Sequence, residues 1–167
     1  MLATVQRVSK AEVIVEDNTY SSIKNGLLIF ICVEENDTQQ TSIDMVNKII
    51  NFKMLEGSKG IASKTLKDSE EEAMIVSQFT LAAITNKGSK PSFHKAAHPE
   101  DAKLLYDEFV AEFKRAFPRV EEGKFGSLME IVLVNKGPVT FNFKIWLTYE
   151  EYFNFLWSTW RKKSRIC

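Results

Sequence analysis

The sequence has few of the residues on which many functional sites are built. Its 167 residues include only two cysteines, two histidines, four prolines and seven glycines. Cys32 lies in an apolar run and Cys167 is the last residue, so they form neither a disulfide framework nor a metal-ligand spacing. His94 and His98 have no ligand partners at a useful spacing. We therefore expect no metal, no cofactor and a reducing compartment.

Neither sign of charge is in excess, because 22 Lys and Arg balance 22 Asp and Glu. The sequence therefore lacks the global basic field of generic nucleic-acid binders. Two local basic stretches remain, one with Lys87, Lys90 and Lys95 and the other at residues 161–165. Either can meet phosphates, although a lysine-rich loop is more often simply solvated. A nucleic acid would then be held by few phosphate contacts, with an affinity that falls with salt.

Long hydrophobic runs are also absent. The first residues become polar before a secretory signal could form, which predicts a cytoplasmic protein. The aromatic segment at 145–157 contains Glu150 and Glu151 and falls short of the ~20 apolar residues that a membrane-spanning helix needs. A composition of 44% hydrophobic and 26% charged residues is typical of one globular domain.

The apolar periodicity predicts short strands, several of them joined by turns. Strands are expected at residues 2–8, 12–16, 27–33, 73–82, 130–135 and 139–143. Lys24-Asn25-Gly26 is a hairpin signal. Together with two helices between the later strands, this pattern predicts an α+β domain.

Two amphipathic helices are expected, at residues 38–52 and 99–117. Asp37 or Thr38 would serve as N-cap of the first, and Pro99 suits the first turn of the second. Their apolar stripes consist of Ile43, Val46, Ile49 and Ile50, and of Leu104, Leu105, Phe109 and Phe113.

Two segments place polar or Gly-Pro units where a buried strand should carry only Val, Ile and Leu. They are Ser77-Gln78-Phe79-Thr80-Leu81 and Asn135-Lys136-Gly137-Pro138-Val139-Thr140. Local departures of this kind mark function or strain. In an extended strand, the side chains of Ser77 and Phe79 would point to one face and those of Gln78 and Thr80 to the other.

Thr80 invites the interpretation of a covalent nucleophile. A nucleophilic threonine needs a nearby base or a free amino terminus, and its own motif offers no His, Lys or carboxylate. The alternative is that Ser77 and Thr80 satisfy backbone groups at a strand end. Gly137-Pro138 alone would be interpreted as an ordinary trans turn or a strand-edge break.

These two segments resemble those of the D-aminoacyl-tRNA deacylases, also called D-tyrosyl-tRNA deacylases. Further resembling segments follow in the same order, at residues 5–8, 25–28, 36–38, 87–94 and 123–126. The resemblance divides the sequence into a deacylase domain at 1–144 and an aromatic and basic tail at 145–167. It departs at residues 17–22, where a Gly-containing turn is more usual.

The resemblance implies a closed or nearly closed antiparallel β-barrel with two helices packed outside. It also implies a homodimeric hydrolase that proofreads translation by cleaving the ester between tRNA and a D-amino acid, or glycine mischarged on tRNA(Ala). Ser77, Gln78, Phe79 and Thr80 would form the catalytic segment, whose backbone N–H groups hold the ester carbonyl while the terminal ribose supplies an activating hydroxyl.

In the same family, a cis Gly137-Pro138 unit is inserted into the partner subunit's site and rejects L-residues. Arg7 would hold this unit by hydrogen bonds, although an Arg in a first strand is usually a surface residue with a snorkelling stem. The side chains expected around the tRNA 3′ end are Phe79, Phe125, Met129, Lys87 and Lys90. As isolated residues, the aromatics and Met129 would be assigned to core packing.

Two other functions stay open at this point. One is a nucleic-acid-binding or adaptor protein that keeps the fold and uses the basic tail. The other is an editing enzyme for a mischarged L-amino acid, which would need a trans Gly137-Pro138 bond. The tail itself is expected to be a helix docked on the barrel, with an interfacial membrane helix or a partner-binding segment as alternatives.

Overall fold

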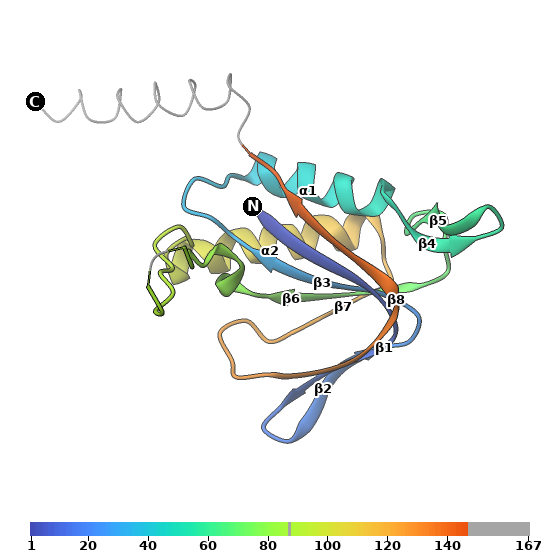
Figure 1. Ribbon diagram of the computed structural model, residues 1–167, viewed down its shortest axis with the longest axis horizontal. Helices are drawn as coiled ribbons and strands as arrows, with labels where there is room; N and C mark the ends of the chain where they lie inside the picture. The colour runs from blue at the N-terminus through green and yellow to red at the C-terminus, as the bar shows by residue number, and fades with distance from the viewer. Residues whose placement is uncertain (87, 147–167) are drawn as a thin grey trace, which may run out of the picture.

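The computed structural model describes residues 1–86 and 88–146. A six-stranded sheet and two helices make up most of this part of the chain (Figure 1). The sheet strands are β1 (Leu2–Val15), β2 (Asn18–Ile23), β3 (Gly26–Cys32), β6 (Glu72–Ser77), β7 (Val120–Glu122) and β8 (Glu130–Lys144). The other elements are α1 (Gln39–Asn51), α2 (Pro99–Ala116), the hairpin of β4 (Lys53–Gly57) and β5 (Gly60–Thr65), and the 3₁₀ helix η1 (Phe79–Ala82).

Strand β1 organises the sheet, because it pairs with three others. Its first half pairs with β3, its second half pairs with β2, and β8 runs antiparallel along its other edge. On the far side of β3 the order continues through β6 to β7. The Ser21 hydroxyl of β2 donates to the carbonyl oxygen of Glu122 in β7 at 2.8 Å, so the curled sheet nearly closes on itself.

The expected fold class is confirmed, since the sheet is nearly closed into a barrel and carries two packed helices. The sheet is mixed, however, because β6 runs parallel to both β3 and β7. Parallel neighbours need long crossover connections, and the segments that contain α1 and α2 provide them. Figure 1 shows both helices on one side of the sheet, with the β1–β2 hairpin on the other side.

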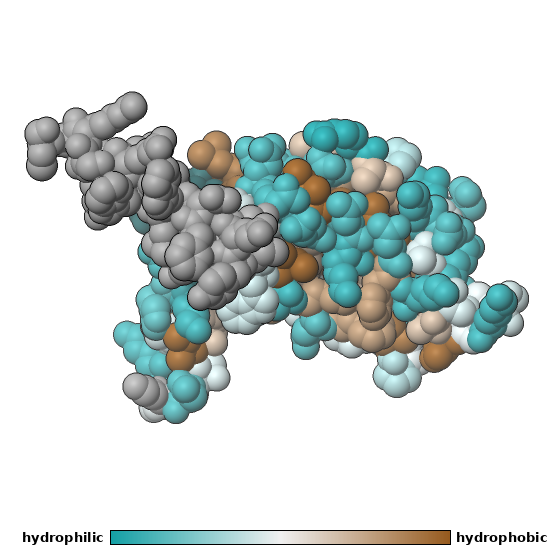
Figure 2. All heavy atoms as spheres, turned by 90° about the horizontal axis from the view of Figure 1, so that it is seen from above, coloured by the Kyte–Doolittle hydropathy of each residue, from teal (hydrophilic) through white to brown (hydrophobic). Residues whose placement is uncertain are grey.

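The two faces of β3 are covered by different hydrophobic clusters. Leu27 and Ile29 pack toward α1 and α2, together with Phe109 and Phe113 of α2. Leu28 packs into the second cluster inside the curl, with residues of β1, β2 and β6. Burial on both faces explains why β3 reads as a continuous apolar run. Figure 2 shows the outer side of the helix layer, the side that faces away from the sheet. Hydrophobic residues form patches there among hydrophilic ones.

Several expected strands have different limits in the structure. The strands expected at 2–8 and 12–16 are one strand, β1, and those at 130–135 and 139–143 are one strand, β8. The strand expected at 73–82 ends at Ser77, and η1 follows it. Strands β2, β4, β5 and β7 were not expected, because they are short and mostly polar.

The hairpin expected at Lys24-Asn25-Gly26 was wrong. Strands β2 and β3 do not pair with each other but lie end to end along β1. Gly26 is needed for another reason: a Cβ there would lie 1.9 Å from the Glu72 carbonyl oxygen of β6. The glycine therefore permits a close approach of two backbones.

The true hairpin turn joins β1 and β2 at Glu16 and Asp17. Both residues have positive φ, 51° and 60°, and Val15 pairs with Asn18, so the loop has two residues. Positive φ at both positions is typical of a type I′ turn, which usually contains Asn or Gly. The Asn18 amide donates to the Glu16 carbonyl at 2.6 Å across this turn. The sequence therefore lacks the glycine that the family usually has at 17–22, but it still forms a hairpin here, with other residues in the turn.

Both helices occur where they were expected. Thr38 is the N-cap of α1 and forms a capping box with Thr41, and Pro99 opens α2. The stripe of α2 differs in one place: Leu104 is 66% exposed, whereas Tyr106 is buried. No helix within residues 1–86 and 88–146 is long and apolar enough to cross a membrane. The expected tail, apart from Ile145 and Trp146, lies outside the described residues.

Candidate active site

The Ser77–Thr80 segment lies where β6 stops and the chain turns into η1. The Gln78 N–H donates to the Ile31 carbonyl at 2.7 Å, which ties the segment to β3. The expected alternation of side chains along a strand is therefore wrong beyond Ser77, because residues 79–82 are helical. Gln78 and Thr80, which were expected on one face, do contact each other, with the Gln78 side-chain amide donating to the Thr80 hydroxyl at 2.5 Å.

Two backbone N–H groups of this turn make no hydrogen bond within residues 1–86 and 88–146. They belong to Phe79 and Thr80, at the start of η1. The first amides of a helical turn lack an internal acceptor and therefore seek an external one. An oxygen atom placed here would be a suitable acceptor.

Beside this turn lies a cavity of about 510 Å³. It opens at the carboxyl ends of β3 and β6 and is bounded by the segment before α2 and by the first turns of that helix. Its lining is mainly apolar and consists of Ile31, Cys32, Val33, Ser77, Gln78, Phe79, Phe93, Ala96, Ala97, His98, Pro99, Ala102, Tyr106, Phe125 and Gly126. A concave apolar site with a few polar groups is typical of a ligand-binding pocket.

Two pairs of aromatic rings line this cavity. Phe79 and Phe93 meet edge to face with ring centroids 5.2 Å apart, and both side chains are exposed. In the second pair, Tyr106 and Phe125 lie 5.3 Å apart, and the Lys103 ammonium lies 5.8 Å from the Phe125 ring centre. Such rings suit a flat aromatic ligand beside a negatively charged group.

Two ionisable groups in the cavity wall, Cys32 and Tyr106, are held neutral by burial. Burial raises the pKa of the Cys32 thiol to about 11, so this group is protonated at neutral pH. Burial also raises the pKa of Tyr106, whose hydroxyl donates to the Ile75 carbonyl at 3.1 Å. Neither group is therefore prepared as an anionic nucleophile.

The Gly137-Pro138 unit lies in a wide bulge of β8. Gln6 pairs with Thr140 and Val8 pairs with Asn135, so residues 136–139 lie opposite a single residue of β1. The Gly137–Pro138 peptide bond is cis, as the resemblance implies. A Cβ on Gly137 would lie 2.2 Å from the Val139 nitrogen and 2.4 Å from the Asn135 side-chain oxygen. Only glycine fits this position without a shift of the backbone.

Arg7 is the residue of β1 opposite this bulge. It is only 3% exposed, which excludes the snorkelling surface role. Its Nε donates to the Lys136 carbonyl at 2.7 Å, and one terminal nitrogen donates to the carbonyls of Met54, at 3.4 Å, and Ile61. The guanidinium thus joins the start of the Gly-Pro bulge to the β4–β5 hairpin, a task for which its fixed planar donors are suited.

The structure does not bring all expected site residues together within one chain. Gly137 and Pro138 are exposed and do not line the cavity, and neither does Arg7. Met129 lies near Gly123 and Val76, packs against the second cluster, and lines a smaller hollow near Glu16.

Lys90 is exposed, and Lys87 lies outside the described residues. Sequence reasoning missed the cavity residues Cys32, His98 and Tyr106. Of these, only Tyr106 carried a usable signal, its place in an amphipathic helix. Within the described parts of the chain, no three His, Cys, Asp or Glu side chains form a group that could hold a metal ion.

Comparison with known proteins agrees with this geometry. A family model described as D-Tyr-tRNA(Tyr) deacylase matches residues 4–144. A D-aminoacyl-tRNA deacylase of Francisella tularensis subsp. holarctica is 43% identical over 145 residues, which are 87% of this chain and 100% of that protein. A protein of the same name from Cupriavidus necator is 40% identical over 146 residues, 84% of this chain and 95% of its own.

Two solved structures are also similar. One, titled "c-Myc DNA Unwinding Element Binding Protein", has a TM-score of 0.84 and 35% identity, covering 88% of this chain and 100% of that one. The other, of a probable eukaryotic D-amino acid tRNA deacylase, has a TM-score of 0.77 at 18% identity over 86% and 98% of the two chains, and shows the fold alone. On these matches, this chain belongs to the D-Tyr-tRNA(Tyr) deacylase family.

Proposed function

We infer that this protein is a D-aminoacyl-tRNA deacylase, a hydrolase that cleaves the ester between tRNA and a D-amino acid, or glycine mischarged on tRNA(Ala). The family match over residues 4–144 carries this inference. The apolar cavity beside Ser77–Thr80 gives the reaction a place. The activity would remove wrongly charged tRNA before translation uses it, and a cytoplasmic location stays a prediction.

The proposed reaction needs positioning more than a reactive side chain. Water adds to the ester carbonyl carbon, the carbonyl oxygen becomes negative, and the unused N–H groups of Phe79 and Thr80 donate to it. The bond between that carbon and the ribose oxygen then breaks, and the ribose oxygen takes the proton that the attacking water gives up. The products are the free D-amino acid and tRNA with its terminal hydroxyl restored. Oriented donors of this kind are worth a large part of such a barrier.

The cavity walls suit the tRNA 3′ end. In this proposal Phe79 and Phe125 would offer ring faces to the terminal adenine, and the exposed Lys90 and Lys103 would meet phosphates. Met129 and Lys87 remain proposed contacts of the tRNA 3′ end on the basis of the resemblance alone. Met129 lines a different, smaller hollow. Few basic contacts are needed, because only the acceptor end is held.

We place Gly137-Pro138 in the cavity of a second copy of the chain. The exposure of this unit, its position outside its own cavity and its support by the buried Arg7 all favour such a role. In the partner's site, its backbone carbonyls would accept from the α-amino group of a D-residue and crowd out an L-side chain. Rejection by collision leaves the accepted D-side chains varied. The active species would then be a homodimer.

The test is the hydrolysis of D-tyrosyl-tRNA and L-tyrosyl-tRNA by the purified protein under identical conditions. We expect release of tyrosine from the D-ester at least roughly 100-fold faster than from the L-ester, because the L-side chain would collide with the Gly-Pro unit. Release from the L-ester alone would instead support L-amino-acid editing. Release from neither ester would overturn both assignments.

A nucleic-acid-binding role is the second candidate. The family match and the named relatives do not favour it over the hydrolase, although a chain titled as a DNA unwinding element binding protein is 35% identical. Binding of duplex DNA and of uncharged tRNA can be compared across a salt series, with the full chain and with a variant lacking residues 147–167. If the full chain binds DNA as tightly as it binds tRNA, and the variant without residues 147–167 no longer binds DNA, the result would support this role. If that variant still deacylates D-tyrosyl-tRNA, the result would support the hydrolase.

A further inference from the structure

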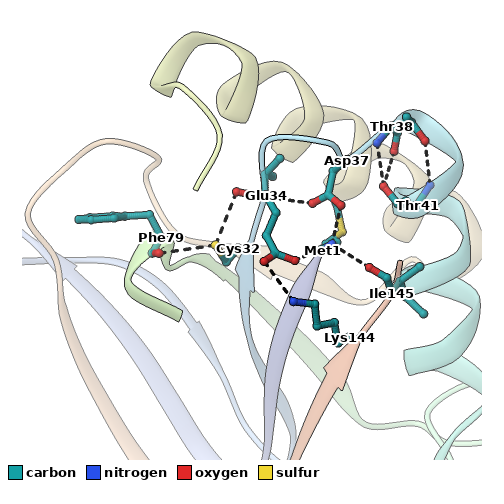
Figure 3. Close-up of polar contacts among 10 residues, drawn as sticks. Met1, Cys32, Glu34, Asp37, Thr38, Thr41, Phe79, Lys144 and Ile145 are labelled. Atoms are coloured by element: carbon teal, nitrogen blue, oxygen red, sulfur yellow. Dashed lines mark hydrogen bonds and ion pairs between the residues drawn. The ribbon is translucent and has the colours of Figure 1, made fainter. Parts of the chain in front are cut away.

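The α-ammonium group of Met1 is buried among three acceptors (Figure 3). It donates to the Asp37 carboxylate at 2.5 Å, to the Ile145 carbonyl at 3.0 Å and to the Glu34 carboxylate at 3.5 Å. Met1 itself has 0% of its side chain exposed, and the Asp37 side chain has 6%. This ion pair is therefore screened from water on both sides, unlike an ordinary surface pair.

The two carboxylates that receive the ammonium also organise the segment between β3 and α1. The second oxygen of Asp37 accepts from the Glu34 N–H at 2.7 Å, and Thr38, the next residue, caps α1. The other oxygen of Glu34 accepts from the Lys144 ammonium at 3.2 Å. The ammonium thus balances one of two negative charges at the point where β1, β8 and this segment meet.

The same segment supports one wall of the cavity. The Glu35 N–H donates to the Lys95 carbonyl at 3.1 Å, and the Ala97 N–H donates to the Val33 carbonyl at 3.0 Å. Glu34 and Ala96 form an antiparallel bridge. Because Ala96 and Ala97 line the cavity, a displacement of residues 33–37 would reach the cavity through direct backbone contacts.

We propose that the Met1 nitrogen is a modification-sensitive site, and that an acyl group on it, such as formyl or acetyl, loosens the cavity wall and lowers deacylation. Acylation replaces a cation with three donors by a neutral amide with one donor. Two carboxylates, one of them buried, would then face an added carbonyl group. Removal of one partner of a buried ion pair is far more costly than its loss at a surface. The part of this proposal that concerns deacylation rests on the proposed function.

The test compares the full chain with a free Met1 and the full chain with formyl-Met1, made by expression with deformylase inhibited and identified by mass. We expect the formyl form to melt about 10 °C lower, a shift converted from the cost of breaking a buried pair in a chain of this size. We also expect faster amide exchange at residues 33–37 and 95–97 and a several-fold slower release of D-tyrosine. Equal melting and exchange would overturn the proposal.

Two substitutions distinguish the loss of the Met1 ion pair from a general destabilisation caused by the formyl group. In Glu34→Gln and Asp37→Asn proteins, formylation should lower the melting temperature less than in the unchanged chain, because the pair is already weakened. Glu35→Gln is the matched control: its carboxylate is exposed, and formylation should keep its full effect there. An equal loss in all four backgrounds would count against the proposal.

The outcomes also separate this proposal from the proposed function. If the protein with free Met1 hydrolyses no D-tyrosyl-tRNA, the proposed function fails, while melting and exchange still decide whether the ammonium supports the cavity wall. If it does hydrolyse the ester and formylation changes neither melting nor rate, the proposed function stands and the Met1 site fails.

Discussion

The two unusual strand segments of this protein are opposites in shape. Residues 77–79 lie at the end of a strand and line a concave, apolar cavity. Residues 136–139 interrupt the pairing of a strand and form a bulge that is exposed at 136–138 and held by the buried Arg7. Polar departures from strand patterning can therefore mark either a site that receives a ligand or a segment that is presented to another molecule. The sequence alone does not distinguish them.

Of the changes that test these two segments, Gly137→Ala should have the largest effect on the rate of deacylation. The new methyl group would meet the Val139 nitrogen and the Asn135 side chain, so the bulge must move. We expect D-tyrosyl-tRNA hydrolysis to fall roughly 100-fold, as small misplacements of positioning groups do. Steady-state kinetics measures this, and Val132→Ala, an exposed change on the same strand outside the bulge, is the control. A wild-type rate for Gly137→Ala would remove the bulge from the reaction.

Arg7→Leu should affect both stability and activity. Three carbonyl groups lose a charged donor, and we expect the free energy of unfolding to fall by about 3 kcal/mol in urea titration. Deacylation should fall with it because the bulge is no longer held. Arg7→Lys should recover only part of the loss, since one ammonium cannot replace the planar set of donors. Full recovery by Lys would show that charge alone is needed.

Ala102→Leu tests the concave side. The larger side chain would occupy part of the cavity, and we expect KM for D-tyrosyl-tRNA to rise about tenfold, the effect of small volume changes in an apolar pocket. The melting temperature should stay nearly constant because the cavity is open. Ala111→Leu, on an exposed position of the same helix, should leave KM unchanged. Equal KM values for the two variants would mean that the substrate does not enter this cavity.

Thr80→Ala should have the smallest effect. If backbone N–H groups hold the ester, the variant loses only the contact with Gln78, and kcat should fall by no more than about tenfold. Thr80→Ser keeps the hydroxyl and should match the unchanged protein. An inactive Ala variant that folds and binds substrate, with Ser still active, would restore Thr80 as the nucleophile.

The sequence predicted the elements with strong local signals. Thr38 and Pro99 mark helix starts through cap chemistry, which acts within one turn, and both were located correctly. Glu16 and Asp17 form a hairpin turn without the usual residues, so no local signal marked it. Gly26 gave a false hairpin signal. A glycine is needed there because the backbone of β6 approaches closely at Glu72, which is 46 residues later in the sequence.

The candidate site was predictable in its motifs and not in its shape. Residues 77–80 were found because they break strand patterning, but their turn into η1 depends on the Ile31 carbonyl of another strand. The burial of Arg7 likewise depends on carbonyls of Met54, Ile61 and Lys136, which are distant in sequence. Cavity walls such as Ala97 and Ala102 carry no chemical signal of their own.

The pairing of β1 on both edges has a consequence for how this protein can vary. Residues 2–8 are bonded to β3 on one side and flanked by β8 on the other, so their register is fixed twice. Insertion or deletion of one residue between Met1 and Arg7 would turn the arginine to the opposite face of the sheet or move the first residue away from Asp37. Homologous chains should therefore tolerate substitutions along this strand far more readily than any change in its length.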